Sequence, residues 1–376
     1  MSNCATVPVR KPLPEEFSKT AQIPDIPRAK FWGDEAPSFF EAVIGQPREK
    51  LKQAFSGIYG KAHNYLALSG GGANGAFGAG LMVGWSAAGT RPEFTMVTGI
   101  STGALMAPFV FLGAAYDDLL KEMYTTHSTK DLVIKYNILT ALTGSSFADT
   151  TPLKKMLAKY IDQPVMAAIA TEYKKGRRLW VGTSNLDAKR PVIWNIGLIA
   201  ASGHPDALKL IHKIILASAS IPGAFPPVLF EVETDGRRYD ELHVDGGATE
   251  QVFLYPPRLD WKVIIQKLEV KGSPRVYVVR NSFLKPDYEV VKPKILPISG
   301  NTIDSLIRTQ GIGDMYRIYV DCQRDGIDYN LAYIPKDFDL KPNEDFDPVY
   351  MGKLFEMGYQ MAKNGYPWDK GPPGFE

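Results

Sequence analysis

The sequence predicts a three-layer α/β/α sandwich built around a mostly parallel sheet. Two observations support this fold class. Short apolar runs with strand character alternate with longer helical patterns, and the first two runs each pass through a glycine-rich turn into a helical segment. Parallel strands need such crossover connections, because a tight turn cannot join them. The expected strands span residues 65–68, 94–98, 178–184, 192–194, 239–244, 275–279 and 329–334.

Several expected helices are marked by their ends. Thr151 and Pro152 form a start signal, a capping hydroxyl followed by a proline at the first helical position, and Gly176 ends the next helix. Asp347 and Pro348 begin the last helix in the same way. Further expected helices span residues 47–55, 104–115, 206–218 and 303–322.

The domain organisation follows from composition along the chain. Residues 1–30 contain five prolines and little periodicity, so residues 1–60 are predicted to form a proline-rich N-terminal tether and strap. No internal repeat is visible, and no linker after residue 60 is long enough to separate a second domain. Residues 61–376 are therefore predicted to form a single α/β domain.

Bulk composition excludes several classes of protein. With 45% hydrophobic and 22% charged residues, the 376-residue chain matches an ordinary folded protein. A formal charge of +2 gives no general attraction to nucleic acid, and two cysteines are too few for a disulfide framework. The longest apolar run, residues 104–115, is shorter than the roughly 18 residues of a membrane-spanning helix. An intact signal peptide would begin with a charged segment followed by a long apolar core, and the sequence does not show this pattern.

The first motif is a glycine-rich loop at residues 69–75, Ser-Gly-Gly-Gly-Ala-Asn-Gly, between a strand and a helix. Glycines let backbone N–H groups converge on an anion. The loop also matches a dinucleotide fingerprint at Gly70, Gly72 and Gly75, but the acidic residue expected after the second strand is missing. A phosphate-binding Walker loop would need Lys-Ser/Thr, where the sequence has Ala76 and Phe77. A plain tight turn remains the structural alternative.

The second motif is Gly-Ile-Ser-Thr-Gly at residues 99–103, which joins a strand to a helix. A G-x-S-x-G segment in this context places its serine on a sharp, strained turn that exposes the hydroxyl. Gly99 and Gly103 leave room for that turn. Ser101 is therefore the predicted nucleophile, the alternative being a serine that only caps the helix.

The third motif is Asp-Gly-Gly at residues 245–247, directly after a predicted strand. Asp-Gly is first a turn signal. At a strand end, with Gly246 and Gly247 leaving space beside it, Asp245 is also where a carboxylate could meet a serine on a neighbouring loop.

Together these motifs resemble the patatin-like phospholipase family, in which a glycine-rich oxyanion loop, G-x-S-x-G and Asp-Gly-Gly or Asp-Gly-Ala follow in that order. The block Ala-Ser-Ala-Ser-Ile-Pro-Gly-Ala-Phe-Pro-Pro at residues 217–227 resembles the family segment ahead of the aspartate. The resemblance covers residues 65–247, and beyond Gly247 no chemical motif is recognised. One departure is Asn74, where the family usually carries Arg or Lys.

The resemblance implies a phospholipase A-type lipid acyl hydrolase that works through an acyl-serine intermediate and needs no metal or organic cofactor. Ser101 would be the nucleophile, Asp245 its base, and amides of Gly70, Gly71 and Gly72 the oxyanion hole. The expected partner is a membrane lipid or other acyl ester, and no nucleic acid. Two alternatives stay open: an esterase or thioesterase on soluble acyl groups, and a catalytically silent lipid-binding protein.

The histidines bear on whether the base is an aspartate. A hydrolase triad in the order serine, acid, histidine needs a histidine after the acid, and all five histidines precede Asp245. A triad through Asp187 with His204, His212 or His243 stays open, without a supporting pattern. His243 shares a strand face with Asp245 and could adjust its pKa, the alternative being an ordinary buried strand residue.

Cys4 suggests a location. It opens Cys-Ala-Thr ahead of the proline-rich segment, as at the start of a mature bacterial lipoprotein. Lipidated Cys4 would tether the protein at the bacterial cell envelope in peripheral or lipid-anchored membrane contact. The alternatives are a cytoplasmic protein and a thiol with no role.

Overall fold

A nine-stranded mixed sheet forms the centre of the computed structural model, which describes residues 10–135, 148–286, 288 and 290–375. Its five central strands are parallel and run in the order β6 (Arg178–Asn185), β3 (Met96–Gly99), β2 (Asn64–Leu68), β10 (Arg275–Phe283) and β11 (Asp328–Ile334). The antiparallel strands continue from β6 and comprise β7 (Arg190–Asn195), β1 (Lys30–Trp32), β9 (Arg237–Asp245) and β8 (Val228–Thr234). A separate pair joins β4 (Ile134–Lys135) to β5 (Ala148–Asp149).

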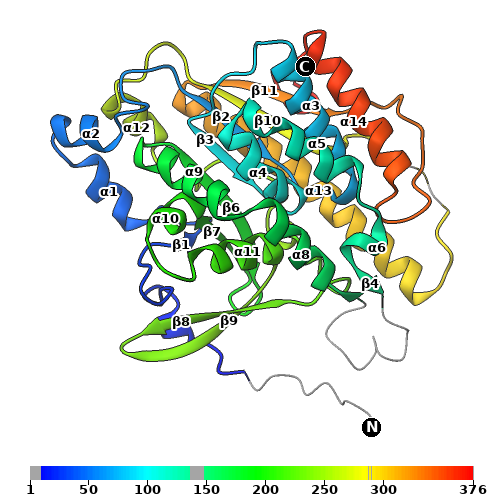
Figure 1. Cartoon of the computed structure of the whole chain (residues 1–376), viewed down its shortest axis with the longest axis horizontal. Helices are drawn as coiled ribbons and strands as arrows, with labels where there is room; N and C mark the ends of the chain where they lie inside the picture. The colour runs from blue at the N-terminus through cyan, green and yellow to red at the C-terminus, as the bar shows by residue number, and fades with distance from the viewer. Residues whose placement is uncertain (1–9, 136–147, 287, 289, 376) are drawn as a thin grey trace.

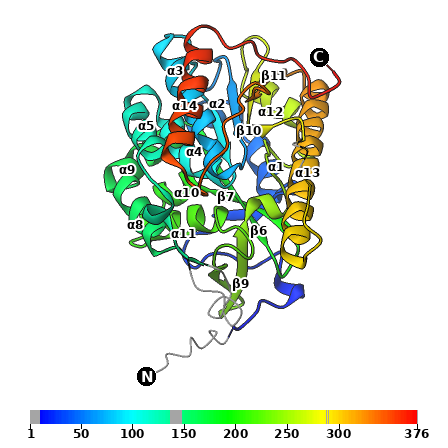
Figure 2. The ribbon, with the colours of Figure 1, turned by 90° about the vertical axis from the view of Figure 1, so that its right-hand side faces the viewer.

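Helices cover both faces of this sheet, which confirms the predicted α/β/α sandwich (Figures 1 and 2). The first face carries α3 (Gly75–Ala87), α4 (Thr102–Leu112), α5 (Asp117–Thr125), α6 (Thr129–Leu132), α8 (Thr151–Tyr160), α9 (Gln163–Lys174), α10 (Ile196–Ala201), α11 (Ala207–Ser218) and α14 (Pro348–Lys363). The second face carries α1 (Ser38–Ile44), α2 (Arg48–Ala54), α12 (Trp261–Lys267) and the long α13 (Ile295–Asp325).

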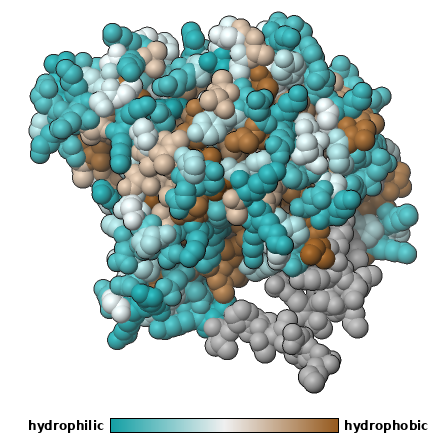
Figure 3. All heavy atoms as spheres, viewed as in Figure 1, coloured by the Kyte–Doolittle hydropathy of each residue, from teal (hydrophilic) through white to brown (hydrophobic). Residues whose placement is uncertain are grey.

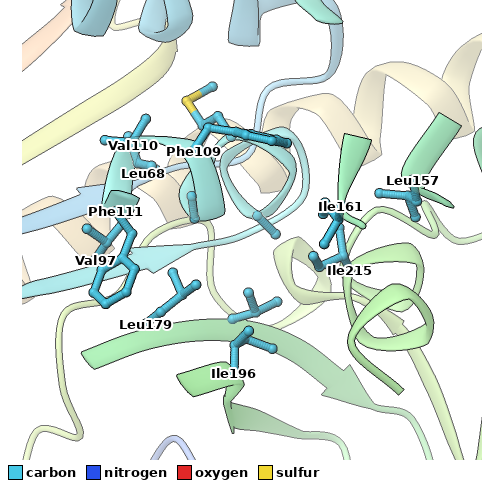
Figure 4. Close-up of a cluster of buried hydrophobic side chains, with 14 of the residues drawn as sticks. Leu68, Val97, Phe109, Val110, Phe111, Leu157, Ile161, Leu179, Ile196 and Ile215 are labelled. Carbon is cyan, nitrogen blue, oxygen red and sulfur yellow. The ribbon is translucent and has the colours of Figure 1, made fainter. Parts of the chain in front are cut away.

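Alternation along the central strands divides the core in two. In β2 the side chains of Leu66 and Leu68 join the core cluster of the first face, whereas Tyr65 and Ala67 join that of the second. Strands buried on both faces read as continuous apolar runs, which is why these short segments were recognisable in the sequence. Figure 4 shows part of the first cluster, where side chains of β2, β3, β6 and α4 pack together.

The N-terminal strap is partly built into the sheet. Lys30–Trp32, which the sequence pattern did not predict as a strand, pairs with β7, and isolated bridges at Pro12 and Gln22 contact β9 and β8. Arg10 makes ion pairs with Asp187 and Asp240. The division of the chain at residue 60 stays a prediction, and Cys4 lies outside the described residues. No helix in the described ranges is long and apolar enough to span a bilayer.

Candidate active site

Ser101 lies on a sharp turn between β3 and α4. Its backbone angles are φ +53° and ψ −122°, a conformation that a residue with a side chain rarely adopts. The turn is tight because a side chain at Gly103 would collide with the backbone oxygen of Leu68. Ser101 precedes the first residue of α4, so its hydroxyl sits at the positive end of the helix dipole. This is the geometry that the G-x-S-x-G pattern predicts.

Asp245 ends β9, which pairs with β6 next to β3, so the sheet brings the third motif beside the second. The carboxyl group is buried, and its Oδ1 accepts a 2.7 Å hydrogen bond from the Gly247 amide. Oδ2 makes no well-formed hydrogen bond with any described residue, although the Ser101 hydroxyl lies close enough to influence its titration. The residues predicted as nucleophile and base are therefore neighbours.

Burial sets the acidity of this carboxyl group. Desolvation raises the pKa of Asp245 to about 7, while the Ser101 hydroxyl and the Gly247 amide act in the opposite direction. A carboxylate with a pKa near neutrality can both accept and return a proton around pH 7. The electrostatics thus suit Asp245 to acid–base chemistry rather than to a permanent ion pair.

Two serines of the block at residues 217–227 hold the site together. The Ser218 hydroxyl accepts a 3.0 Å hydrogen bond from the Ser101 amide and donates a 2.6 Å bond to the Gly182 carbonyl. The Asp245 amide donates to the Ser220 carbonyl at 2.9 Å. The sequence revealed this block only as a resemblance, and its structural role is to fix the backbones of both candidate catalytic residues.

The glycine loop lies beside Ser101. Gly72, at φ +55°, lines the same cavity as Ser101 and is not buried. The Gly70 amide donates a 3.0 Å bond to the Gln251 carbonyl, so it is already engaged and is not a free oxyanion donor. Of the three predicted oxyanion donors, Gly71 and Gly72 therefore remain candidates.

Residues from the last third of the chain support this loop. Asn281, on β10, donates its amide to the Ser69 hydroxyl at 2.8 Å and its side chain to the Ser69 carbonyl at 2.9 Å. Its Oδ1 also accepts from the Gly78 amide at 3.1 Å. The backbone oxygen of Asn281 lies so close to Gly71 that a Cβ there would collide with it. No chemical motif is recognised beyond Gly247, so sequence reasoning missed these contacts.

Gln251 connects the glycine loop to the Asp-Gly-Gly segment. Its carbonyl accepts from Gly70, and its side-chain amide donates to the Gly247 carbonyl at 2.8 Å. The backbone amide of Gln251 in turn donates to Asp314 of α13 at 2.6 Å. Asp314 is buried, and Arg317 lies 3.5 Å from it. Through Gln251 the long helix α13 thus supports two of the three motifs.

Asn74, the departure from the family pattern, is held by the C-terminal helix. The Tyr350 hydroxyl of α14 donates a 2.5 Å hydrogen bond to Asn74 Oδ1. At the position where the family usually has a positive charge, this chain therefore has a neutral asparagine whose side chain is hydrogen-bonded to Tyr350.

An apolar cavity opens at Ser101. Besides Ser101 and Gly72 it is lined mainly by aliphatic and aromatic side chains, among them Leu105, Met123, Leu132, Met156 and Phe225. Such a lining suits a hydrocarbon chain attached to a carbonyl at Ser101. No group of three or more His, Cys, Asp or Glu side chains within the described ranges could hold a metal ion.

The histidines bond elsewhere. His243 is fully buried between Thr183 Oγ1 at 2.9 Å and Glu241 Oε2 at 3.1 Å. His212 contacts the Ile161 carbonyl, His127 the Tyr160 hydroxyl, and His204 accepts from the Asp206 amide. Asp187, the alternative acid, pairs with Arg10 and accepts from the Leu242 amide. These partners favour the reading of His243 as a structural strand residue.

Comparisons with known proteins bear on the family of the chain. The family model described as patatin-like phospholipase matches residues 66–256, which include all three motifs. The crystal structure of VipD from Legionella pneumophila is similar over 81% of this chain, with 13% sequence identity and a TM-score of 0.38. The match covers 66% of the VipD chain, which therefore extends well beyond the compared part. No curated protein matches in sequence. Since the family model spans half of the sequence, the chain belongs to the patatin-like phospholipase family.

Proposed function

We propose that this protein is a lipid acyl hydrolase that cleaves carboxylic esters with Ser101 as nucleophile and Asp245 as its base. The observation that carries the proposal is the placement of a strained serine beside a buried carboxyl group whose pKa is about 7. The apolar cavity beside Ser101 supports an acyl chain as the bound part of the substrate.

The reaction follows from these positions. Asp245 takes the proton of the Ser101 hydroxyl as the oxygen attacks the ester carbonyl. The negative charge that develops on the carbonyl oxygen is stabilised by the amides of Gly71 and Gly72 and by the N-terminus of α4. When the carbon–oxygen bond of the ester breaks, the protonated Asp245 returns its proton to the leaving alcohol. The same carboxylate then deprotonates a water molecule, whose oxygen attacks the acyl-serine carbonyl. As the bond between the acyl carbon and the Ser101 oxygen breaks, Asp245 returns the proton to that oxygen and the carboxylic acid leaves.

Labelling with a fluorophosphonate tests the nucleophile. We expect stoichiometric modification of Ser101, located by mass spectrometry of peptides, and loss of both labelling and ester hydrolysis in Ser101→Ala with the fold unchanged. Ser86→Ala, a helical serine of α3 whose hydroxyl bonds the Met82 carbonyl, is a matched control. Modification of another residue, or a fully active Ser101→Ala protein, would overturn the assignment.

The same activity assays separate the alternative substrates. Turnover of micellar phospholipid above that of short-chain soluble esters supports a lipid substrate, and the reverse supports an esterase or thioesterase. A lipid-binding protein without activity would retain binding while Ser101 stays unlabelled.

Anchoring at Cys4 is a separate proposal. With a lipoprotein leader in a bacterial host, the protein should enter the membrane fraction, and Cys4→Ser should release it. One acyl chain gives only marginal membrane binding, so stable retention would indicate several chains. Equal distribution of both forms would refute the anchor.

A further inference from the structure

A second cavity lies on the opposite face of the sheet from α4, over the amino-terminal ends of the central strands. Its floor includes Tyr65 of β2, Met96 of β3 and Trp180 of β6. Met96 opens β3 and Ser101 follows its end, so at about 3.3 Å per residue the two are roughly 16 Å apart. None of the described residues that line this cavity lines the one at Ser101.

The walls are apolar and largely aromatic. The half-buried Phe39 and Phe40 of α1 and Phe55 just after α2 form one wall, and Trp261 of α12 forms another. The cavity has a volume of about 140 Å³. In Figure 1, α1, α2 and α12 lie together at one end of the molecule, and Figure 3 shows apolar surface among polar residues at that end. Such walls fit a hydrocarbon chain.

The covering helix α1 is short and packs on the core only through half-buried side chains. It has seven residues, all of them described, and none is buried. A helix this short gains little stability of its own and depends on packing. It could therefore yield to a chain that enters beneath it.

The charges at this cavity are of one sign. Arg28, Arg178 and Lys267 line it, and no carboxylate is found among its described lining residues. The Arg178 guanidinium donates to the carbonyls of Arg177 at 2.9 Å and Tyr173 at 3.4 Å. It lies 4.6 Å from the ring centre of Tyr173 and makes no ion pair within the described part of the chain. Arg178 is half-buried, and desolvation lowers its pKa, as expected for a cation that is partly withdrawn from water without an anion.

Two indole donors at the same cavity are also unsatisfied. Trp180 is 2% and Trp261 6% exposed, and the Nε1 of each is buried without a well-formed hydrogen bond to any described residue. Trp261 lies near the Tyr65 hydroxyl without completing such a bond. Buried donors are nearly always paired in folded proteins, so these two call for an acceptor.

We infer that this cavity is a binding site for a long-chain carboxylate, with the carboxylate at Arg178 and the hydrocarbon chain between the aromatic walls. A carboxylate supplies the negative charge that Arg178 lacks, and a single chain suits the narrow apolar space. The inference does not depend on the chemistry proposed for Ser101, because the two cavities share no lining residue in the described ranges.

Calorimetric titration of full-length Ser101→Ala with laurate and with dodecanol tests the site. We expect laurate to bind, Arg178→Met to weaken it by about tenfold or more, and Arg178→Lys to restore much of the affinity. Dodecanol should bind more weakly than laurate and be indifferent to Arg178→Met. Leu105→Trp, which narrows the Ser101 cavity, is the matched control and should leave this laurate site intact.

A second variant guards against a folding defect in Arg178→Met. Val43 lies on the half-buried side of α1 and lines the cavity, so Val43→Trp should fill the space and exclude laurate while the main fold is retained. Unchanged laurate affinity in both folded variants, or binding abolished by Leu105→Trp alone, would overturn the proposal.

Discussion

The two ends of strand β3 present opposite electrostatic situations. At its carboxyl end the buried Asp245 faces Ser101 and has no cationic partner among the described residues, while near its amino end Arg178 is desolvated without an anionic one. The first group responds by holding its proton more tightly, since a carboxyl can become neutral near pH 7. An arginine stays protonated at that pH and can only attract an anion. A desolvated ionisable group without a partner thus points to proton transfer at one site and to ligand binding at the other.

The residues that surround Ser101 also differ in kind from those that surround the second cavity. Glycines and a strained serine allow substrate to approach the backbone at Ser101, whereas bulky aromatic side chains fill the other end. The reactive site depends on positions of backbone atoms and the second cavity on side-chain surface. Substitutions should therefore affect turnover at the first and affinity at the second.

Asp245→Asn should produce the largest effect in this comparison. It keeps the shape but removes the base, so kcat/KM should fall by about 100- to 10,000-fold. In the wild-type protein kcat/KM should rise with pH up to about 7, where the carboxylate forms, and then level off. Rates across pH with a micellar phospholipid measure both effects.

The free energy of unfolding should change with pH in the opposite direction to kcat/KM. Because the folded pKa of Asp245 lies above its ordinary value of 3.8, the unfolded chain releases the proton first. Wild-type stability should therefore fall as pH rises from about 4 to about 7, and Asp245→Asn should lack this part of the loss. Asp240→Asn, on the same strand but paired with Arg10, is the control and should keep its activity. Full activity in Asp245→Asn would remove the base from the mechanism.

Gly72→Val should have the second largest effect on turnover. A Cβ at Gly72 would meet no atom within 4 Å, but a β-branched residue strains the φ +55° backbone and should shift the amide away from the oxyanion. Loss of one oxyanion donor typically slows catalysis about 100- to 1000-fold. Gly236→Val is the matched control, because Gly236 has φ +69° in the β8–β9 turn with open space around it. Equal kcat in both variants would show that the glycine loop is only a turn.

The parts of the site formed by residues close together in the sequence could be predicted, whereas contacts between distant residues could not. Ser101 and the glycine loop lie in local patterns whose residue types fix the backbone, so their positions followed from sequence alone. The supporting contacts join Ser69 to Asn281 and Gln251 to Asp314, pairs separated by 212 and 63 residues. No local pattern marks such partners, because only the sheet order and the packing of α13 bring them together.

The same reasoning explains why some strands were predicted from the sequence and others were not. The central strands are buried on both faces and stood out as apolar runs, whereas β1 has three residues and β8 alternates with charged ones. The expected role of Gly70 depended on its amide being free, which only the contact with Gln251 could decide.

Ser218→Ala should have a smaller effect on turnover. It removes the acceptor for the Ser101 amide and leaves the buried Gly182 carbonyl without that donor, so we expect a loss of about 1–3 kcal/mol in stability. The strained turn should relax, lowering kcat by roughly tenfold with little change in KM. Ser202→Ala, a serine bonded only locally at the end of α10, controls for the change of residue type. A lower stability with unchanged kcat would limit Ser218 to a structural role.

His243→Gln should change activity least and tests whether the site hides a triad. His243 bonds Thr183 and Glu241, and Glu241 also pairs with Lys30 at 2.8 Å, so the ring belongs to a buried structural network. Desolvation lowers the pKa of His243 from 6.5, which keeps it neutral at pH 7. The unfolded chain therefore binds a proton first as pH falls below about 6.5, and wild-type stability should decline there. The glutamine variant should lack this decline, be less stable at pH 8, and retain kcat/KM within about threefold, a change of under 1 kcal/mol in the barrier. Thermal unfolding and kcat/KM across pH 5–9 make the comparison. A folded His243→Gln protein with activity as low as Asp245→Asn would place the histidine in the proton path and replace the dyad by a triad.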